Sequence, residues 1–318
     1  MSLNISIEIK FIIFQLLIIT PFVIGLLVRK RILNPPGLSK KLIRINLFVN
    51  EPVIIIWSVW GLFLKKELSV LPLTGLFMVS LGFVLGRVIT RFLNLDNKSK
   101  TTFTVCSSIS NHGFTLGAFL CYLLVGEVGL GLSSVFILYF TPFVFGFLFP
   151  YVQLKDRAKK IDLKKIKEMV LTPQNLPLLS VIIAFTLHGI GIPRPQIFFP
   201  IEIFLIILCI IYYFTLGINF EFCNIKSIKS RHLLIAAVKF LAIPVAVYFI
   251  MGFSNIDNNM KSVVFIQSFM PAGIYTVVTS ILFDLNHKLA SSLFIVNTAL
   301  FIVLILPLLF FLRNFFIF

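Results

Sequence analysis

The chain has 318 residues, of which 58% are apolar, and it carries 28 lysine and arginine residues against 12 aspartate and glutamate residues. Its mean hydropathy is +1.03, which excludes an ordinary soluble domain, because no core of this size could bury so much apolar surface. The composition therefore predicts an integral membrane protein embedded in a lipid bilayer. Basic loops that orient such a chain and attract anionic lipid account for the formal charge of +16, so no nucleic-acid partner is needed to explain it.

Apolar stretches of about 17 to 24 residues, long enough to cross a bilayer as helices, recur along the whole chain. They lie at residues 11–28, 43–64, 70–89, 101–124, 129–149, 176–192, 201–220, 232–253, 261–282 and 290–312. We therefore predict ten transmembrane helices. The first is followed by Arg29, Lys30 and Arg31 instead of a small-residue cleavage site, which favours a retained helix over a signal peptide.

Two ionisable side chains lie well inside these stretches: Glu51 in the second and Lys239 in the eighth. Each is seven or eight residues past the predicted start of its helix, so the two could lie at one depth and face each other. Buried charges in membranes indicate function, here a proton carried by Glu51 or a fixed counter-charge supplied by Lys239. The structural alternatives are an ion pair between them, or a Lys239 side chain that extends to the membrane surface.

Two of the stretches contain a cluster of helix-breaking residues near their middle. Ser110-Asn111-His112-Gly113 interrupts the fourth stretch, and Met270-Pro271-Ala272-Gly273 interrupts the ninth. Irregular backbone at that depth is tolerated only beside other protein or a cavity. Paired interruptions at corresponding positions in two halves of a chain indicate the substrate site of a secondary transporter.

The two breaks suggest how a substrate would be bound. The second half of each broken helix begins near the bilayer midplane with free N–H groups and the positive end of the helix dipole, which favours an anion. A small organic carboxylate is the simplest such substrate, and the first half-helices, which end in carbonyls, suit a proton or a cation. The candidate substrate-binding residues are Asn111, His112, Gly113, Pro271, Ala272, Gly273, Tyr275 and Thr276, with Glu51 and Lys239 for coupling or charge balance.

The basic residues predict the orientation of the helices. Roughly twenty-one of the 28 lie in the odd-numbered loops or at their edges, in groups at 29–44, 87–100, 155–167 and 226–231 and at Lys288. Because cytoplasmic loops carry the excess of lysine and arginine, both termini are predicted to lie outside a multi-pass protein of the cell membrane.

The longest polar stretch, residues 151–174, is interpreted as a basic cytoplasmic linker between a first repeat at 1–150 and a second at 175–318. Each repeat would hold five helices. Because five is an odd number of crossings, the second repeat starts on the opposite side of the membrane and is inverted relative to the first. The fourth and ninth helices then correspond, and Asn111 and Pro271 lie 160 positions apart, as do Thr101 and Lys261. The predicted fold is all-α, with two inverted five-helix repeats and broken, crossing helices four and nine.

Several runs resemble helices of the auxin efflux carrier family. The similar runs are 267–276 with 284–292 and 306–308 for its ninth and tenth helices, 239–244 for its eighth, 215–219 for its seventh, and 175–177 with 189–193 for its sixth. Two positions depart from the family pattern: Tyr275 stands where an asparagine is common, and Gly117-Ala118 where a proline is common.

The resemblance implies that helices one, two, six and seven form a scaffold, and that helices three to five and eight to ten form a moving core that works by alternating access. Homodimers occur in related carriers, so a homodimer is one assembly that it allows. The bile acid/sodium symporter family shares this crossed architecture and is the alternative, although its carboxylate and amide sodium ligands are not evident here.

The sequence thus predicts a secondary transporter of a small organic anion. Coupling to a proton, to sodium or to neither stays open, and so does a transporter-like receptor that binds without transport. No motif of a membrane-embedded enzyme is present, since the chain lacks His-Glu-x-x-His, paired intramembrane aspartates and Gly-x-Ser-x-Gly. The four cysteines have no Cys-x-x-Cys spacing, and neither a metal site nor a cofactor is predicted.

Overall fold

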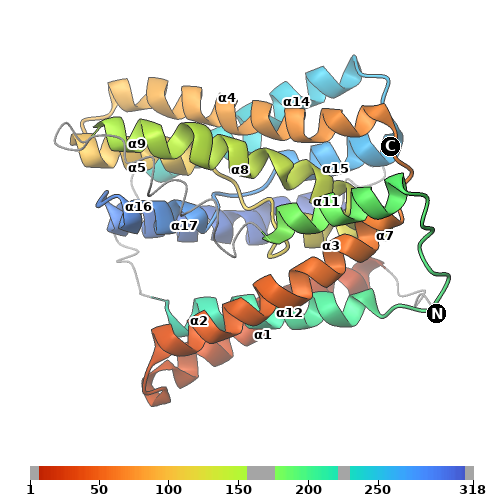
Figure 1. Cartoon of the computed structure of the whole chain (residues 1–318). Coiled ribbons are helices and arrows are strands. Elements are labelled where there is room, and N and C mark those ends of the chain that lie inside the picture. Colours follow the sequence, from red (N-terminus) through yellow and green to blue (C-terminus); the bar gives the residue numbers. More distant parts are fainter. Residues whose placement is uncertain (1–6, 156–175, 221–229, 312–318) are drawn as a thin grey trace.

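The computed structural model describes residues 7–155, 176–220 and 230–311, and this part of the chain is helical without any sheet (Figure 1). The first half contains α1 (Ile7–Val28), α2 (Pro35–Ile45), α3 (Glu51–Trp60), α4 (Val70–Phe92), α5 (Asn97–Ser108), α6 (Gly117–Val125), α7 (Glu127–Phe136), α8 (Phe140–Phe143) and α9 (Phe149–Lys155). The second half contains α11 (Leu176–Gly189), α12 (Ile201–Ile218), α13 (Ser230–Ala237), α14 (Ile243–Gly252), α15 (Asn258–Ser268), α16 (Tyr275–Leu282), α17 (His287–Leu300) and α18 (Leu306–Phe311).

Seven helical runs within the described residues are long and apolar enough to cross a membrane, so the chain is a multi-pass membrane protein by helix length and hydropathy. They are Ile12–Arg31, Pro35–Trp60, Lys66–Phe92, Glu127–Leu154, Ile201–Ile218, Ser230–Gly252 and His287–Phe311. Of the other three predicted stretches, 176–192 forms only the 14-residue α11. The remaining two, 101–124 and 261–282, are each divided into two shorter helices.

The second run begins eight residues earlier than the sequence predicts. The Oδ1 atom of Asn34 accepts the N–H of Gly37 at 2.9 Å, and prolines occupy the first turn, so the helix begins at Pro35 although Ser39, Lys40 and Lys41 follow soon after. Glu51 therefore lies 16 residues into the run, about 24 Å along its axis. The predicted start of this helix at residue 43 is therefore eight residues too late.

Four of the runs contain a π turn that ends two residues before a proline. The π turns are Asn46–Asn50, Val144–Leu148, Val238–Ala242 and Phe301–Ile305, and the prolines are Pro52, Pro150, Pro244 and Pro307. A proline ring clashes with the preceding turn and removes one N–H donor, and the wider π turn accommodates both effects without ending the helix.

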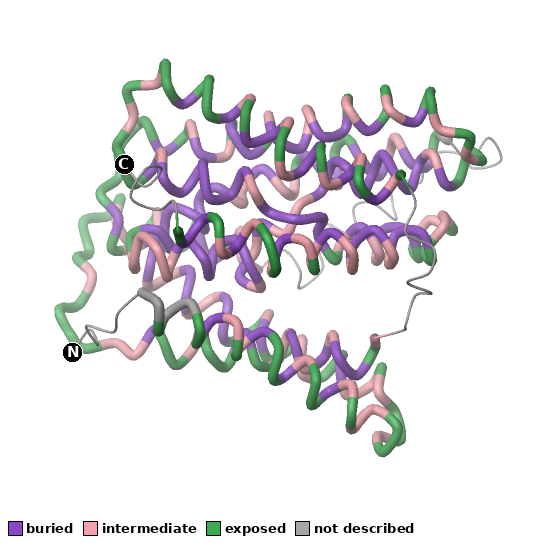
Figure 2. Tube along the Cα trace, turned by 180° about the vertical axis from the view of Figure 1, so that it is seen from behind, coloured by how far each residue is buried: buried purple, intermediate pink, exposed green. Residues whose placement is uncertain are grey.

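The helices form two groups, seen one above the other in Figure 1. In the lower group α1 packs against α12, α12 against α2, and α3 against α11. In the upper group α4 packs against α5 and α14, and the two broken segments lie among α7 and α17. Buried residues run through the interior of both groups in Figure 2.

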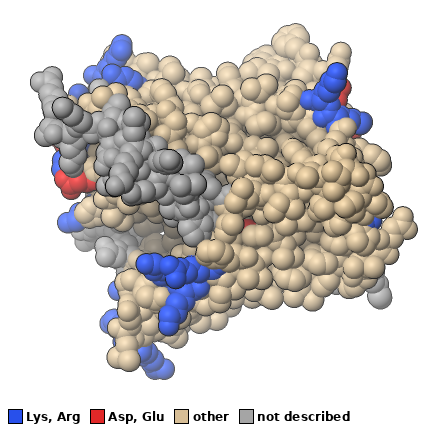
Figure 3. Space-filling view, viewed as in Figure 1, with Lys and Arg blue, Asp and Glu red and all other residues tan. Residues whose placement is uncertain are grey.

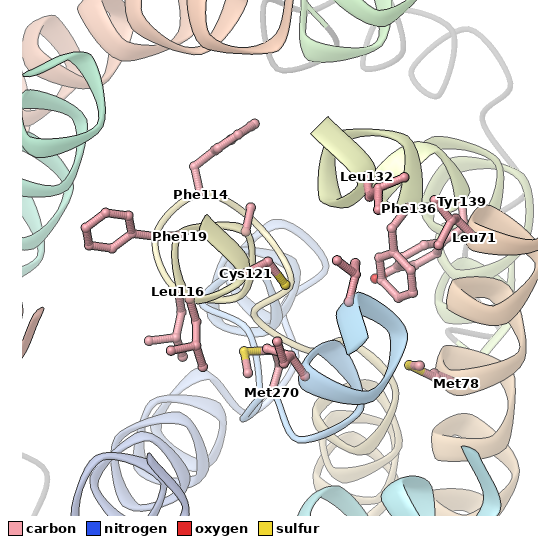
Figure 4. Close-up of a cluster of buried hydrophobic side chains, with 14 of the residues drawn as sticks. Leu71, Met78, Phe114, Leu116, Phe119, Cys121, Leu132, Phe136, Tyr139 and Met270 are labelled. Atoms are coloured by element: carbon pink, nitrogen blue, oxygen red, sulfur yellow. The ribbon is translucent and has the colours of Figure 1, made fainter. Parts of the chain in front are cut away.

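The main hydrophobic core surrounds the broken segments. Figure 4 shows side chains from α4, α6 and α7 in one cluster with Met270 of the second break. At the surface, lysine and arginine gather towards the ends of the helices in Figure 3 and leave the middle largely uncharged, as expected of a membrane-spanning band. Residues 151–155 of the predicted linker continue α9, and the rest of the linker lies outside the described residues.

Candidate functional site

Both predicted helix breaks are present. The first separates α5, which ends at Ser108, from α6, which begins at Gly117. The second separates α15, which ends at Ser268, from α16, which begins at Tyr275. Glycine, proline and asparagine in these segments explain why neither helix continues.

The two breaks pair with each other through backbone hydrogen bonds. The N–H of Asn111 donates to the carbonyl of Pro271 at 2.8 Å, and the N–H of Gly273 donates to the carbonyl of Ile109 at 3.1 Å. Ser110 and Ala272 thereby form an isolated antiparallel bridge. Backbone groups that would be unpaired at the breaks therefore satisfy one another, as burial requires.

A third segment fixes the second break. The Oδ1 atom of Asn297, near the end of α17, accepts the N–H of Ala272 at 2.7 Å. The amide nitrogen of Asn297 has no partner among the described residues, so the side chain is held by this one bond. Asn297 is buried, and its bond to Ala272 supports the crossing, by which we mean the place where the two helix breaks pair through Ser110 and Ala272.

A cavity of about 480 Å³ lies against the crossing, which is within the usual size range of small-molecule sites. Its lining comes from the first break, from the edge of the second, and from helices of both groups. The polar or titratable residues in the lining are Glu51, Ser110, Asn111, His112, Thr115, Ser134, Tyr139, Thr141, Tyr212, Tyr213, Thr215, Asn219, Tyr275 and Thr298. None of the described lining residues is a lysine or an arginine.

The structure brings all ten candidate residues to the crossing or to this cavity, but in different roles. Those that line the cavity are Glu51, Asn111, His112, Gly113, Gly273 and Tyr275. Pro271, Ala272 and Thr276 are buried behind the cavity wall, and the hydroxyl of Thr276 donates to the Gly273 carbonyl at 2.8 Å. Lys239 also lies behind the wall and is fully buried.

The backbone donors at the breaks are fewer than the sequence predicts. The first N–H groups of α6 are already bonded, because Gly117 donates to the Asn111 carbonyl and Ala118 to the Gly113 carbonyl. The N–H groups of Gly113 and Ile274, in contrast, donate to no described residue, and both residues line the cavity. The donors left for a ligand therefore belong to the breaks and not to the first turn of α6.

His112 contacts its neighbours on several sides. Its Nδ1 atom shares a hydrogen bond with the Tyr139 hydroxyl, and its carbonyl accepts the Nε2 group of Gln267 at 3.2 Å. Its ring meets that of Phe136 edge to face. Only 4% of the residue is exposed, so its imidazole is held in one orientation at the cavity wall.

Glu51 and Lys239 do not form an ion pair with each other. The hydroxyl of Tyr212 donates to Oε1 of Glu51 at 2.5 Å, whereas Nζ of Lys239 donates to the Ser108 carbonyl at 3.0 Å and to Oγ of Ser110 at 2.7 Å. Lys239 does not extend to the membrane surface either, since its exposure is 0%. Both structural alternatives considered for this pair are thus excluded.

Several residues of the site were not identified from the sequence. Tyr212 and Tyr213 reach the cavity from α12, and the Tyr213 hydroxyl donates to the Thr115 carbonyl. Gln267 and Asn297 are amides inside the predicted apolar stretches 261–282 and 290–312, which is a signal that could have been used. The two adjacent tyrosines carry no such signal, because tyrosine is common in membrane helices.

Comparison with protein-family models gives no match for this chain, and comparison with curated proteins gives none either.

Proposed function

We propose that the protein is a secondary transporter that moves a small organic anion, a carboxylate, across the cell membrane by alternating access. One observation carries this proposal: a cavity of small-molecule size lies between two groups of helices and is lined by both helix breaks. Broken helices that meet at a cavity are typical of substrate sites in secondary transporters. The resemblance of several runs to auxin efflux carriers agrees with it.

The proposed carrier has ten membrane crossings, because α11 and the two broken segments add three to the seven long runs. The group with α1, α2, α3, α11 and α12 would be the scaffold, and the rest the moving core. The groups meet closely where Gly131 of α7 faces α3, since a Cβ on this glycine would lie 2.7 Å from the Ser58 carbonyl. We further propose that both termini lie outside.

Two features support an inverted repeat. The breaks contact each other at positions about one repeat apart, with Ser110 bridged to Ala272. The π turns at Val144–Leu148 and Phe301–Ile305, in the proposed fifth and tenth helices, begin 157 positions apart, close to the 160 that separate Asn111 from Pro271. Corresponding irregularities at nearly one offset are expected if the two halves share one design.

The lining of the cavity fits an organic anion with an apolar body. Most of the wall is apolar, and the unbonded N–H groups of Gly113 and Ile274 can receive a carboxylate. The Asn111 side chain, whose Oδ1 accepts the Thr115 hydroxyl at 2.6 Å, keeps its amide nitrogen for a ligand. The absence of lysine and arginine from the described lining favours a substrate with few charges.

Transport into proteoliposomes tests the proposal. The purified protein is offered labelled indole-3-acetate, malate and taurocholate, with a proton gradient, a sodium gradient or neither. We expect saturable uptake of one of these and a loss of on the order of tenfold in Asn111→Ala. Asn259→Ala, an exposed asparagine at the far end of α15, is the matched control.

Three results would change the assignment. Unchanged uptake by a folded Asn111→Ala protein would rule out this site. Binding without uptake would favour a receptor, and strict dependence on sodium would favour a symporter of the bile acid type.

A further inference from the structure

The surroundings of Lys239 in the run Ser230–Gly252 are unusual for a lysine. Its side chain is fully buried, and its Nζ donates to the Ser108 carbonyl at 3.0 Å and to Oγ of Ser110 at 2.7 Å. Among the described residues it forms no ion pair with an acidic side chain. The partners of its ammonium group are therefore the Ser108 carbonyl at the end of α5 and the Ser110 hydroxyl of the first break.

The position of the ammonium group is one that suits a cation. Ser108 is the last residue of α5, and the final carbonyls of a helix lack partners within it and form the negative end of its dipole. In transporters with broken helices, such half-helix ends and unwound carbonyls coordinate the coupling cation. Here the ammonium already occupies that place, and a bare ion would be repelled by it.

The ammonium is also close to the cavity. Ser110, which accepts one of its hydrogen bonds, lines the cavity, so one side chain separates Lys239 from a bound substrate. A positive charge at this distance in a poorly hydrated site attracts a carboxylate without touching it. It compensates for the lack of lysine and arginine in the described lining.

We propose that Lys239 is a tethered substitute for a coupling cation, so that the anion is transported without sodium. This inference rests on the proposed transport function. A sodium ion would be released with the substrate after each crossing, whereas the ammonium stays bound to the core and returns with it. The lysine holds the Ser108–Ser110 backbone in its binding geometry and acts as a positioning residue through Ser110.

The first test uses the unmodified protein. Uptake of the transported carboxylate is compared with sodium or with choline as the external cation, at one ionic strength. Equal initial rates are expected. Uptake that requires sodium would overturn the inference and leave the transport proposal standing, whereas uptake of no carboxylate under any condition would contradict both.

Variants then separate charge from packing. Lys239→Met keeps an unbranched side chain without the charge, and we expect uptake to fall on the order of tenfold or more in choline. Lys239→Ala leaves space beside Ser108 and Ser110, and we expect added methylammonium or sodium to restore part of its uptake. The control is Lys66→Met, an exposed lysine remote from the crossing. Full uptake by Lys239→Met without sodium would overturn the inference, as would no response of a folded Lys239→Ala protein to either cation.

Discussion

The two helix breaks contact each other but differ in what surrounds them. Residues 109–115 of the first break all line the cavity. In the second break, Met270 and Ala272 have exposures of 0%, and only Gly273 and Ile274 reach the cavity. The first break therefore offers surface to a ligand, and the second holds the first in position through the bridge and Asn297.

Two helix breaks at corresponding sequence positions therefore have different roles in the structure. A change in the second break should act first on stability, and through it on transport. A change in the first break should act on transport while the fold survives. Paired substitutions can separate these effects.

The largest effect is expected at the glycines of the two breaks. A Cβ on Gly273 would lie 2.9 Å from the Ser110 carbonyl oxygen, so Gly273→Ala should push the bridge apart and cost about 3 kcal/mol. A Cβ on Gly113 would meet no atom within 4 Å, and Gly113→Ala should change stability by less than about 0.5 kcal/mol. Titration with sodium dodecyl sulfate in mixed micelles measures both. Equal losses in the two variants would remove the proposed asymmetry.

Asn297 is expected to have the next largest effect. Asn297→Ala leaves the buried N–H of Ala272 without its acceptor and should cost about 2 kcal/mol. Thr298→Ala is the matched control, because the Thr298 hydroxyl is buried but has no partner among the described residues. The same unfolding titration compares them, and a cost for Thr298→Ala as large as that for Asn297→Ala would mean that the bond to Ala272 is not what matters.

Glu51 tests the role of the cavity lining through the pH dependence of uptake. An ionised Glu51 would repel a bound carboxylate across the cavity, so uptake should rise severalfold from neutral to acidic pH as a proton neutralises it. Glu51→Gln should abolish that rise, whereas Tyr212→Phe, which keeps the carboxyl group, should retain it. The measurement is initial uptake against pH. If uptake by Glu51→Gln still rises at acidic pH, the proton is taken up by another group at the site, such as His112 or Lys239.

The smallest effect is expected where the broken segments meet at the surface. Nζ of Lys98 at the start of α5 lies 2.6 Å from a carboxylate oxygen of Asp284, just beyond α16, and both side chains are mostly exposed. Such pairs contribute little, so Lys98→Ala should lower stability by less than about 0.5 kcal/mol and leave uptake unchanged. A loss of stability as large as that of Gly273→Ala would mean that this ion pair at the surface, and not the bridge between the breaks, holds the two broken segments together.

Much of the architecture could be predicted because its signals are local. Long apolar stretches mark the spans, and Asn111 with Gly113 in one cluster and Pro271 with Gly273 in the other mark the breaks. The early start at Pro35 was missed because hydropathy does not register a cap formed by a polar residue such as Asn34.

The contacts at the site could not be predicted because they join distant parts of the chain. Lys239 and Ser110 are 129 positions apart, and nothing near either residue specifies that they meet. Equal depth suggested that Lys239 and Glu51 face each other. In the structure one lies behind the crossing and the other lines the cavity in front of it.

The π turns before Pro52, Pro150, Pro244 and Pro307 also change how these helices relate to their sequence. Each turn contains one residue more than a regular helix would use, and one residue corresponds to a rotation of about 100°. Residues after the turn therefore point in directions that a single helical wheel assigns to another face. Glu51 directly follows the turn Asn46–Asn50 and lines the cavity together with Leu47, which lies within the turn.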